Sequence, residues 1–258
     1  MQLIVLGSGT SVFHPQRAAA AFWLETEQGS VLLDCSADAP HRMAQEGLDW
    51  PSLDAVWISH LHLDHCGGLA PLLFGMKHAP QTQSRKKPLR IFACAGTKRL
   101  LTAIDEAQVY RLFELPFPLD FAEVSTDNAA QGFEPLRGLT ATFFPTPHRP
   151  ESLAVRLQDE RGITIVYSAD TGFSEEVARF AQGANLFVLE CSFYRAKPIE
   201  THLELVDAIR MAAIAEPRKV MLTHLYPEWD GIDLEDEARK LWPGTTIAAR
   251  DGLRIKVE

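Results

Sequence analysis

The sequence lacks long hydrophobic runs, and this excludes a membrane-spanning helix. Such a helix needs about 20 consecutive apolar residues, and no stretch of the 258 residues approaches that length. The opening residues 1–7 carry no basic charge, and their apolar core is too short for a signal peptide. We therefore expect a cytoplasmic protein with no membrane partner.

Cysteine and positive charge are also scarce. The 4 cysteines are far apart and form no C-x-x-C pair, which favours buried thiols in a reducing compartment over a disulfide framework. The formal net charge is −9, and the one short basic run, at 85–87, lies in a polar, proline-bounded stretch. The electrostatic footprint of a dedicated nucleic-acid-binding protein is therefore absent, although a local patch could still bind nucleic acid.

What the sequence does contain is a globular composition with 46% hydrophobic residues, enough for one large domain spanning 1–258. Apolar, β-branched runs predict strands at 3–6, 21–24, 31–33, 55–59, 89–94, 139–144, 153–157, 163–167, 186–189, 219–222 and 246–249. Helical periodicity appears at 37–46, 69–78, 97–110, 175–181, 203–215 and 234–241. The polar stretches 79–87 and 125–131 are expected to be loops, and the overall pattern is typical of an α/β protein.

One stretch of six residues, from His60 to His65, holds three histidines and an aspartate. In an extended segment, alternation directs His60 and His62 to the same side, and Asp64 and His65 follow at the turn. Imidazole and carboxylate ligands without thiolate favour zinc, with manganese or iron as alternatives. The pattern therefore predicts a metal site rather than a histidine-rich surface loop.

Further histidines and carboxylates follow other predicted strands. His148 comes after 139–144, Asp170 after 163–167, Glu190 after 186–189 and His224 after 219–222. The carboxyl ends of strands in α/β proteins form the edge at which ligands bind. We therefore expect these side chains to meet those of the histidine-rich stretch at a single site.

In its order of motifs the chain resembles the metallo-β-lactamase superfamily. The resemblance covers nearly the whole chain, from Leu6-Gly7-Ser8-Gly9-Thr10 through Tyr167-Ser168-Ala169-Asp170 to Thr223-His224. Glu190-Cys191-Ser192-Phe193, followed by His202, is similar to the Glu/His pair of the ribonuclease Z-like phosphodiesterases. The resemblance implies a four-layer αββα sandwich with two metal ions at the rim between its sheets.

When the ligands of the superfamily are matched motif by motif to this sequence, the resemblance implies two sets of ligands for two divalent ions. They are His60, His62 and His148 for one ion, and Asp64, His65 and His224 for the other, with Asp170 bridging. Two such ions can hold a hydroxide at neutral pH and stabilise the charge that develops in a displacement at phosphorus. We expect this bridging hydroxide to be the nucleophile.

Three residues are expected to act in catalysis. Asp64 would orient the attacking water or take its proton, and His202, held by Glu190, would stabilise a phosphate oxygen or protonate the leaving group. Arg149, Arg195 and Lys197 either grip a phosphate or are solvated loop charges.

One feature departs from the ribonuclease Z pattern. True tRNA-processing members carry a long arm between the third metal histidine and the bridging aspartate, whereas here residues 149–169 are taken up by two predicted strands and a turn. The expected substrate is therefore a small or cyclic phosphodiester. The alternatives are tRNA 3′-end cleavage, hydrolysis of a lactone, thioester or β-lactam, and a non-enzymatic, metal-stabilised scaffold. Relatives in this branch also imply that the chain could pair as a homodimer.

Overall fold

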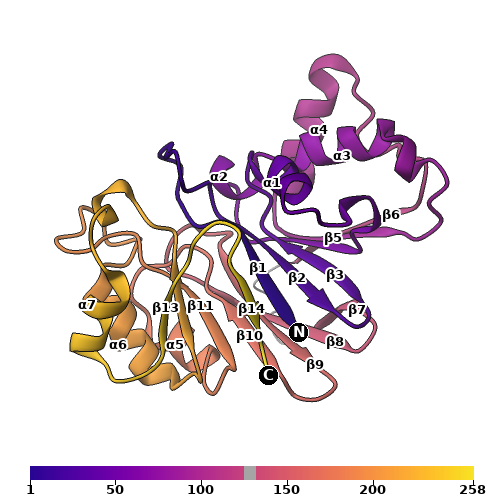
Figure 1. The fold of residues 1–258 in the computed structure, drawn as a ribbon. Helices are drawn as coiled ribbons and strands as arrows, with labels where there is room; N and C mark the ends of the chain where they lie inside the picture. The colour runs from indigo at the N-terminus through magenta and orange to yellow at the C-terminus, as the bar shows by residue number, and fades with distance from the viewer. Residues whose placement is uncertain (125–131) are drawn as a thin grey trace.

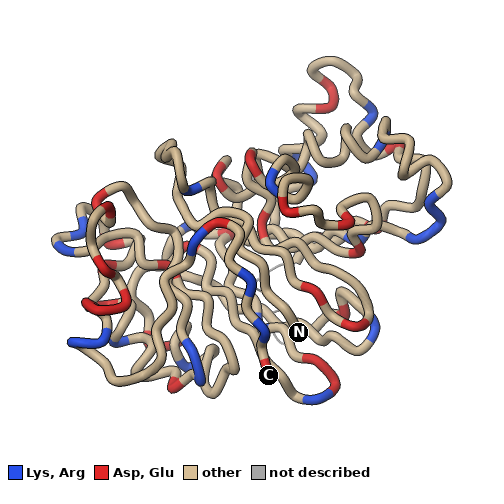
Figure 2. Tube along the Cα trace, in the orientation of Figure 1, with Lys and Arg blue, Asp and Glu red and all other residues tan. Residues whose placement is uncertain are grey.

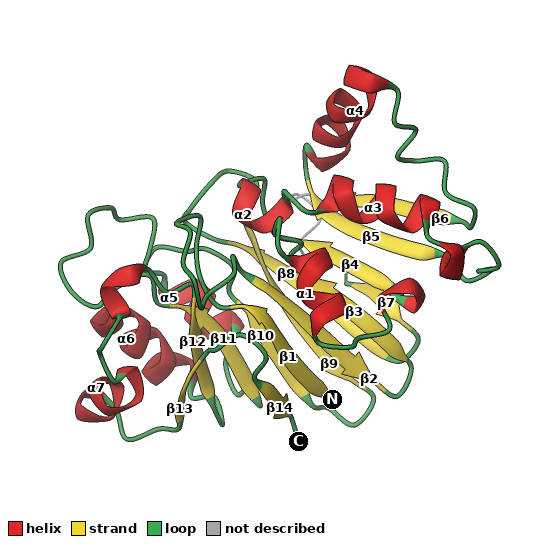
Figure 3. Ribbon diagram, turned by 45° about the horizontal axis from the view of Figure 1, so that its top comes forward, coloured by secondary structure: helices red, strands yellow, loops and turns green. Residues whose placement is uncertain are grey.

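The computed structural model describes residues 1–124 and 132–258, which form two β-sheets packed face to face between two groups of helices (Figure 1). Figure 3 shows both sheets in yellow, with helices α1–α4 on one side of the pair and α5–α7 on the other. The four-layer αββα sandwich expected from the sequence is confirmed.

The first sheet has the strand order β14-β1-β2-β3-β4-β5-β6, and β3 to β6 run parallel. Its strands are β1 (Gln2–Gly7), β2 (Ala21–Thr26), β3 (Gly29–Leu33), β4 (Ala55–Ile58), β5 (Leu89–Cys94), β6 (Leu119–Val124) and β14 (Arg254–Lys256). The helices on its side are α1 (Ala39–Gln45), α2 (Leu63–Cys66), α3 (Leu69–His78) and α4 (Thr97–Gln108). Short 3₁₀ turns occur at Trp50–Ser52 and Pro80–Thr82.

The second sheet has the order β13-β12-β11-β10-β9-β8-β7, with β10 to β13 parallel. Its strands are β7 (Phe133–Leu136), β8 (Leu139–Pro145), β9 (Leu153–Asp159), β10 (Thr164–Tyr167), β11 (Leu186–Glu190), β12 (Val220–Thr223) and β13 (Thr246–Ala248). Helices α5 (Glu175–Phe180), α6 (Leu205–Ala215) and α7 (Leu234–Leu241) pack on its outer side, and a 3₁₀ turn lies at Pro227–Trp229.

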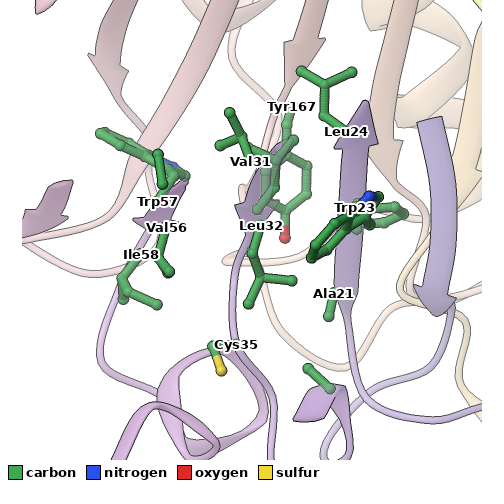
Figure 4. Close-up of a cluster of buried hydrophobic side chains, with 14 of the residues drawn as sticks. Ala21, Trp23, Leu24, Val31, Leu32, Cys35, Val56, Trp57, Ile58 and Tyr167 are labelled. Atoms are coloured by element: carbon green, nitrogen blue, oxygen red, sulfur yellow. The ribbon is translucent and has the colours of Figure 1, made fainter. Parts of the chain in front are cut away.

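Large apolar side chains fill the space between the sheets. Trp57 of β4 stacks on Phe133 of β7 with ring centroids 5.6 Å apart. Tyr167 of β10 meets the edge of Phe22 of β2 at 5.2 Å, and Figure 4 shows its ring lying beside Val31 of the first sheet. Burying each such side chain contributes roughly 1.5–3 kcal/mol. This core fixes the position of one sheet against the other.

The observed elements follow the predicted ones, with a few corrections. The strand expected at 55–59 ends at Ile58, and the helices expected at 37–46 and 203–215 begin two residues later. Strands β6, β7 and β14 and the one-turn helix α2 were not predicted. The expected loop at 79–87 contains a 3₁₀ turn, and the one at 125–131 lies outside the described residues.

The membrane expectation can be checked on the described ranges. Among helices formed by 1–124 and 132–258, none has the length and apolar character required to cross a bilayer.

Candidate metal centre

Segments from both sheets converge on one group of histidines and carboxylates. After β4 the chain supplies His60, and α2 and the turn before it supply the rest of the histidine-rich stretch. The second sheet supplies His148 after β8, Asp170 after β10 and His224 after β12. The parallel order of β10, β11 and β12 places their carboxyl ends side by side, so the residues that follow them meet at one edge.

The grouping contains two clusters of the expected ligands, and a third group joins His202 to Asp170 and His224. The His60 cluster contains His60, His62 and His148, and the His65 cluster contains Asp64, His65 and His224. Within each cluster the candidate ligand atoms lie within 4.8 Å of one another, and Asp170 belongs to the same group as the His60 cluster. The structure therefore brings together every metal-ligating residue expected from the sequence.

Asp170 lies between the clusters and turns one oxygen toward each. Its Oδ2 is 3.6 Å from Nε2 of His60 and 3.6 Å from Nε2 of His148. Its Oδ1 is 3.2 Å from Nε2 of His65 and 3.4 Å from Nε2 of His224. A carboxylate in this position is suited to bridge two cations.

The donor set fits divalent metal ions. Four buried atoms have no hydrogen-bond partner among the residues that the structure describes: Nε2 of His60, His65 and His224 and Oδ1 of Asp170. Buried polar atoms are normally paired, and leaving one unpaired costs roughly 1–3 kcal/mol. These atoms instead point at one another in a nitrogen- and carboxylate-rich site, as metal ligands do. The unpaired atoms therefore form a donor set that suits divalent cations.

A buried carboxylate that sequence reasoning missed supports the His65 cluster. Asp34, which follows β3 and is 0% exposed, accepts from Nδ1 of His65 at 2.7 Å. It also accepts from the hydroxyl of Tyr167 at 2.7 Å and from the backbone N–H of Ser59 at 2.8 Å. A carboxylate on the far nitrogen of a metal-bound histidine fixes the ring's orientation and strengthens it as a ligand. The signal was available, since Asp34 directly follows a predicted strand.

His202 and Glu190 meet beside the clusters, as expected. Nδ1 of His202 is 2.9 Å from Oε1 of Glu190, and the His202 ring lies 4.8 Å from that of His148. Burial acts to lower the pKa of His202, but the charge and hydrogen bond of Glu190 outweigh it and raise the pKa to about 9. At neutral pH His202 therefore carries a proton that it can donate.

The clusters also shift one another's proton equilibria. Burial and the neighbouring histidines hold the pKa of His60 well below its usual value. Burial opposes the charged form of Asp64, but His224 and His65 still lower the pKa of that carboxyl. A neutral imidazole and an ionised carboxylate are the forms that bind a metal ion.

Three of the seven non-glycine residues that have positive φ among the described residues lie at the same edge. Asp34, Ala169 and His224 have φ angles of 56°, 52° and 59°. These lie in the left-handed region, which residues other than glycine rarely adopt. Each follows a strand, β3, β10 or β12, at the point where the chain turns into the site. Such strain costs of order 1–3 kcal/mol per residue and collects at functional sites.

The three basic residues considered as phosphate ligands differ in their surroundings. Nζ of Lys197 is 2.6 Å from Oδ2 of Asp207 on α6, so this lysine is occupied by an ion pair. Arg195 lies over the ring of Tyr194 at 4.4 Å and its side chain is 73% exposed. Arg149 is exposed and directly follows the third histidine of the His60 cluster. Of the three, Arg149 is the one that is exposed and adjacent in sequence to a cluster histidine.

Comparison with known proteins agrees with this site. A ribonuclease Z of Ignicoccus hospitalis is 26% identical over 306 residues, covering 99% of this chain and 98% of that protein. YhfI of Bacillus subtilis, named a probable metallo-hydrolase, is 26% identical over an alignment of 260 positions, and the alignment covers 98% of this chain and 98% of that protein. Its crystal structure has a TM-score of 0.81 at 24% identity. A diphosphatase from the PhnP family has a TM-score of 0.77 at 20% identity, covering 100% of this chain and 98% of that one.

The fold, the clustered ligands and these relatives define a metal-dependent hydrolase with the metallo-β-lactamase fold. Within that class, the family model described as "Anti-Pycsar protein Apyc1" matches residues 1–242, and the chain belongs to that family. The expected superfamily and the expected enzyme class are both confirmed.

Proposed function

We propose that this protein hydrolyses a phosphodiester with two divalent cations, with zinc as the first choice and manganese or iron as alternatives. The observation that carries the proposal is the position of Asp170, whose two oxygens face different histidine clusters. The ribonuclease Z and diphosphatase names of the relatives point to the same chemistry.

In this proposal the His60 cluster holds one ion, the His65 cluster holds the other, and Asp170 bridges them. When bound, two such ions make a hydroxide available at neutral pH and neutralise the charge that develops on the phosphate. The side chains fix where this happens, because most of their ligand atoms are buried at the sheet edge.

Three residues have further roles in the proposed reaction. Asp64, whose side chain is 11% exposed, orients the attacking water and can accept its proton. His202 donates a proton to the leaving oxygen from its Nε2 side, because its Nδ1 is bound to Glu190. Glu190 itself is held by the backbone N–H groups of Thr171 and Leu203, at 2.7 and 3.0 Å, so its position is fixed.

A small or cyclic phosphodiester fits this chain better than a folded RNA. The residues between His148 and Asp170 are filled by β9 and β10, which leaves no long arm at that point to dock a tRNA. Figure 2 shows basic and acidic positions interleaved along the trace rather than gathered into a basic stripe. The net charge of −9 also opposes attraction to a polyanion.

The proposal is tested by assaying one protein preparation on bis-p-nitrophenyl phosphate, a 3′,5′-cyclic nucleotide, a lactone and a β-lactam. We expect turnover of the phosphodiesters, abolished by a chelator and restored by zinc or manganese. Lactone or β-lactam turnover with no phosphodiester turnover would overturn the proposal.

A second candidate is tRNA 3′-end endonuclease activity, which the nearly full-length match to a ribonuclease Z favours. Site-specific cleavage of a precursor tRNA at a rate above that of the cyclic nucleotide would replace the first proposal with this one.

A further inference from the structure

Two buried serines occupy matching places in the two clusters. Ser59 directly follows β4, Ser192 lies shortly after β11, and both are 0% exposed. Each hydroxyl lies between a buried carboxylate and a histidine that faces Asp170. Neither serine is among the ligand or proton-transfer groups described above.

The hydrogen bonds of Ser192 determine where His224 carries its proton. The Ser192 hydroxyl donates to Oε2 of Glu190 at 2.7 Å, and its oxygen is 2.9 Å from Nδ1 of His224. A hydroxyl has a single hydrogen, and an ionised carboxylate can only accept one. Because that hydrogen goes to Glu190, the serine oxygen must accept from Nδ1 of His224. With its hydrogen on Nδ1, the ring offers Nε2, which faces the site, to a cation.

Ser59 makes the same arrangement of hydrogen bonds in the His60 cluster. The Ser59 hydroxyl donates to Oδ2 of Asp34 at 2.8 Å, and its oxygen is 3.0 Å from Nδ1 of His60. The hydrogen of the neutral His60 ring is thereby placed on Nδ1. Its Nε2 is buried, has no hydrogen-bond partner within residues 1–124 and 132–258, and lies 3.6 Å from Oδ2 of Asp170.

We propose that Ser59 and Ser192 are positioning residues that fix the tautomer and orientation of one histidine ligand in each cluster. Each serine connects its histidine to a buried carboxylate that already binds a second histidine directly. Asp34 thus orients one ligand in each cluster. Glu190 orients the ligand His224 through Ser192 and holds the proposed proton donor, His202, directly. The inference rests on the two-ion centre of the proposed function and concerns its affinity for ions.

Replacing either serine with alanine removes the acceptor for a buried Nδ1–H. The histidine can then move its hydrogen to Nε2 or rotate, and either change competes with metal binding. Loss of such a partner typically weakens metal binding about 10- to 100-fold.

The test is competition for zinc between the protein and a chromophoric chelator. We expect Ser192→Ala and Ser59→Ala each to bind one of two zinc ions about 10- to 100-fold more weakly, and Ser192→Thr to restore wild-type affinity. Ser152→Ala is the matched control, since Ser152 is also 0% exposed but its hydroxyl has no hydrogen-bond partner in the described part of the chain.

A double-mutant cycle assigns each serine to its cluster. In a His224→Ala background, adding Ser192→Ala should cause no further loss of zinc affinity, whereas adding Ser59→Ala should weaken the remaining ion. If these variants do not fold, imidazole ¹⁵N shifts of the unmodified protein still report the tautomers. We expect the ring hydrogens of His60 and His224 on Nδ1.

The inference would be overturned if Ser59→Ala and Ser192→Ala bound zinc as tightly as Ser152→Ala does. It would also be overturned if the rings of His60 and His224 carried their hydrogens on Nε2. An equal loss at both ions from either serine would also overturn it, because that is what a general structural role produces. Failure of the proposed function is separable, since it appears as absent phosphodiester turnover in the zinc-loaded wild type.

Discussion

Of the site residues, His202 has the contacts that most directly support the proposed phosphodiester chemistry. It is held by Glu190 at 2.9 Å and its ring is nearly parallel to that of His224, with centroids 5.3 Å apart and 15° between planes. The proposed cleavage of a phosphodiester expels an alkoxide, and a protonated His202 can supply the proton that this leaving group needs.

We expect His202→Ala to lower kcat about 10²- to 10⁴-fold on a 3′,5′-cyclic nucleotide. The loss should be much smaller on bis-p-nitrophenyl phosphate, since p-nitrophenolate leaves without protonation. Steady-state kinetics on both substrates, with metal content measured in parallel, check this expectation. His41→Ala, at an exposed position on α1, is the control. Equal losses on the two substrates would contradict the role of proton donor.

For individual residues, the sequence predicted well which side chains lie together at the site, because these polar residues follow the ends of strands. His148, Asp170 and His224 come from distant segments, and parallel strands bring their ends to one edge. Asp34 follows a predicted strand and offered a signal that was overlooked, whereas the two serines were missed for a physical reason. Their importance lies in which ring nitrogen they contact, and that depends on side-chain geometry that spacing along the chain does not encode.

Strand β10 links the two sheets at the site. The hydroxyl of Tyr167 crosses from β10 to Asp34, which follows β3, and makes a 2.7 Å hydrogen bond there. Both groups are buried, and this burial raises the pKa of Tyr167, so the hydroxyl remains a donor. The link holds the His65 side of the site against the second sheet.

We expect Tyr167→Phe to lower the free energy of unfolding by about 1–3 kcal/mol, because it leaves a buried carboxylate with one donor fewer. Urea denaturation in the presence of a chelator measures this without any contribution from bound ions. Tyr110→Phe is the control, since Tyr110 is 40% exposed. No difference between the two variants would show that the hydroxyl contributes nothing to joining the sheets.

The strands that were not predicted have weak strand patterns in their sequences. Strand β6 is half exposed along its length and contains two acidic residues, so it lacks the apolar run of a central strand. Strand β7 contains Pro135, and proline is usually found only at sheet edges. In the observed order β6, β7 and the three-residue β14 all lie at sheet edges. Pairing with a neighbour, rather than local preference, makes these segments strands.

For the whole molecule, bound ions should act as a stabilising cross-link. The proposed ligands come from both halves of the sandwich, and a ligand that binds only the folded state stabilises it by about 2.7 kcal/mol at 100 times its Kd. We therefore expect a chelator to lower Tm by roughly 5–10 °C. Differential scanning calorimetry with and without added zinc checks this value. An unchanged Tm would mean that the clusters hold no ion tightly.

The distribution of charge bears on the size of the substrate. The net charge is −9, and basic and acidic positions are interleaved along the trace of the described residues (Figure 2). We expect precursor tRNA to bind with no better than roughly micromolar affinity at about 0.15 M salt, as non-specific complexes do. Fluorescence anisotropy measures it, with an unrelated single-stranded RNA as control. Nanomolar binding specific to the tRNA would contradict this expectation.

The most direct test of the two-ion centre is to titrate the metal-depleted protein with zinc while following phosphodiester hydrolysis. The proposal predicts that the rate rises as ions fill the site and levels off at two equivalents per chain. It also predicts that Asp170→Asn, which removes the bridging charge, does not reach that plateau at the same zinc concentration. Full turnover by the metal-depleted protein, or a plateau at one equivalent, would contradict the proposed mechanism.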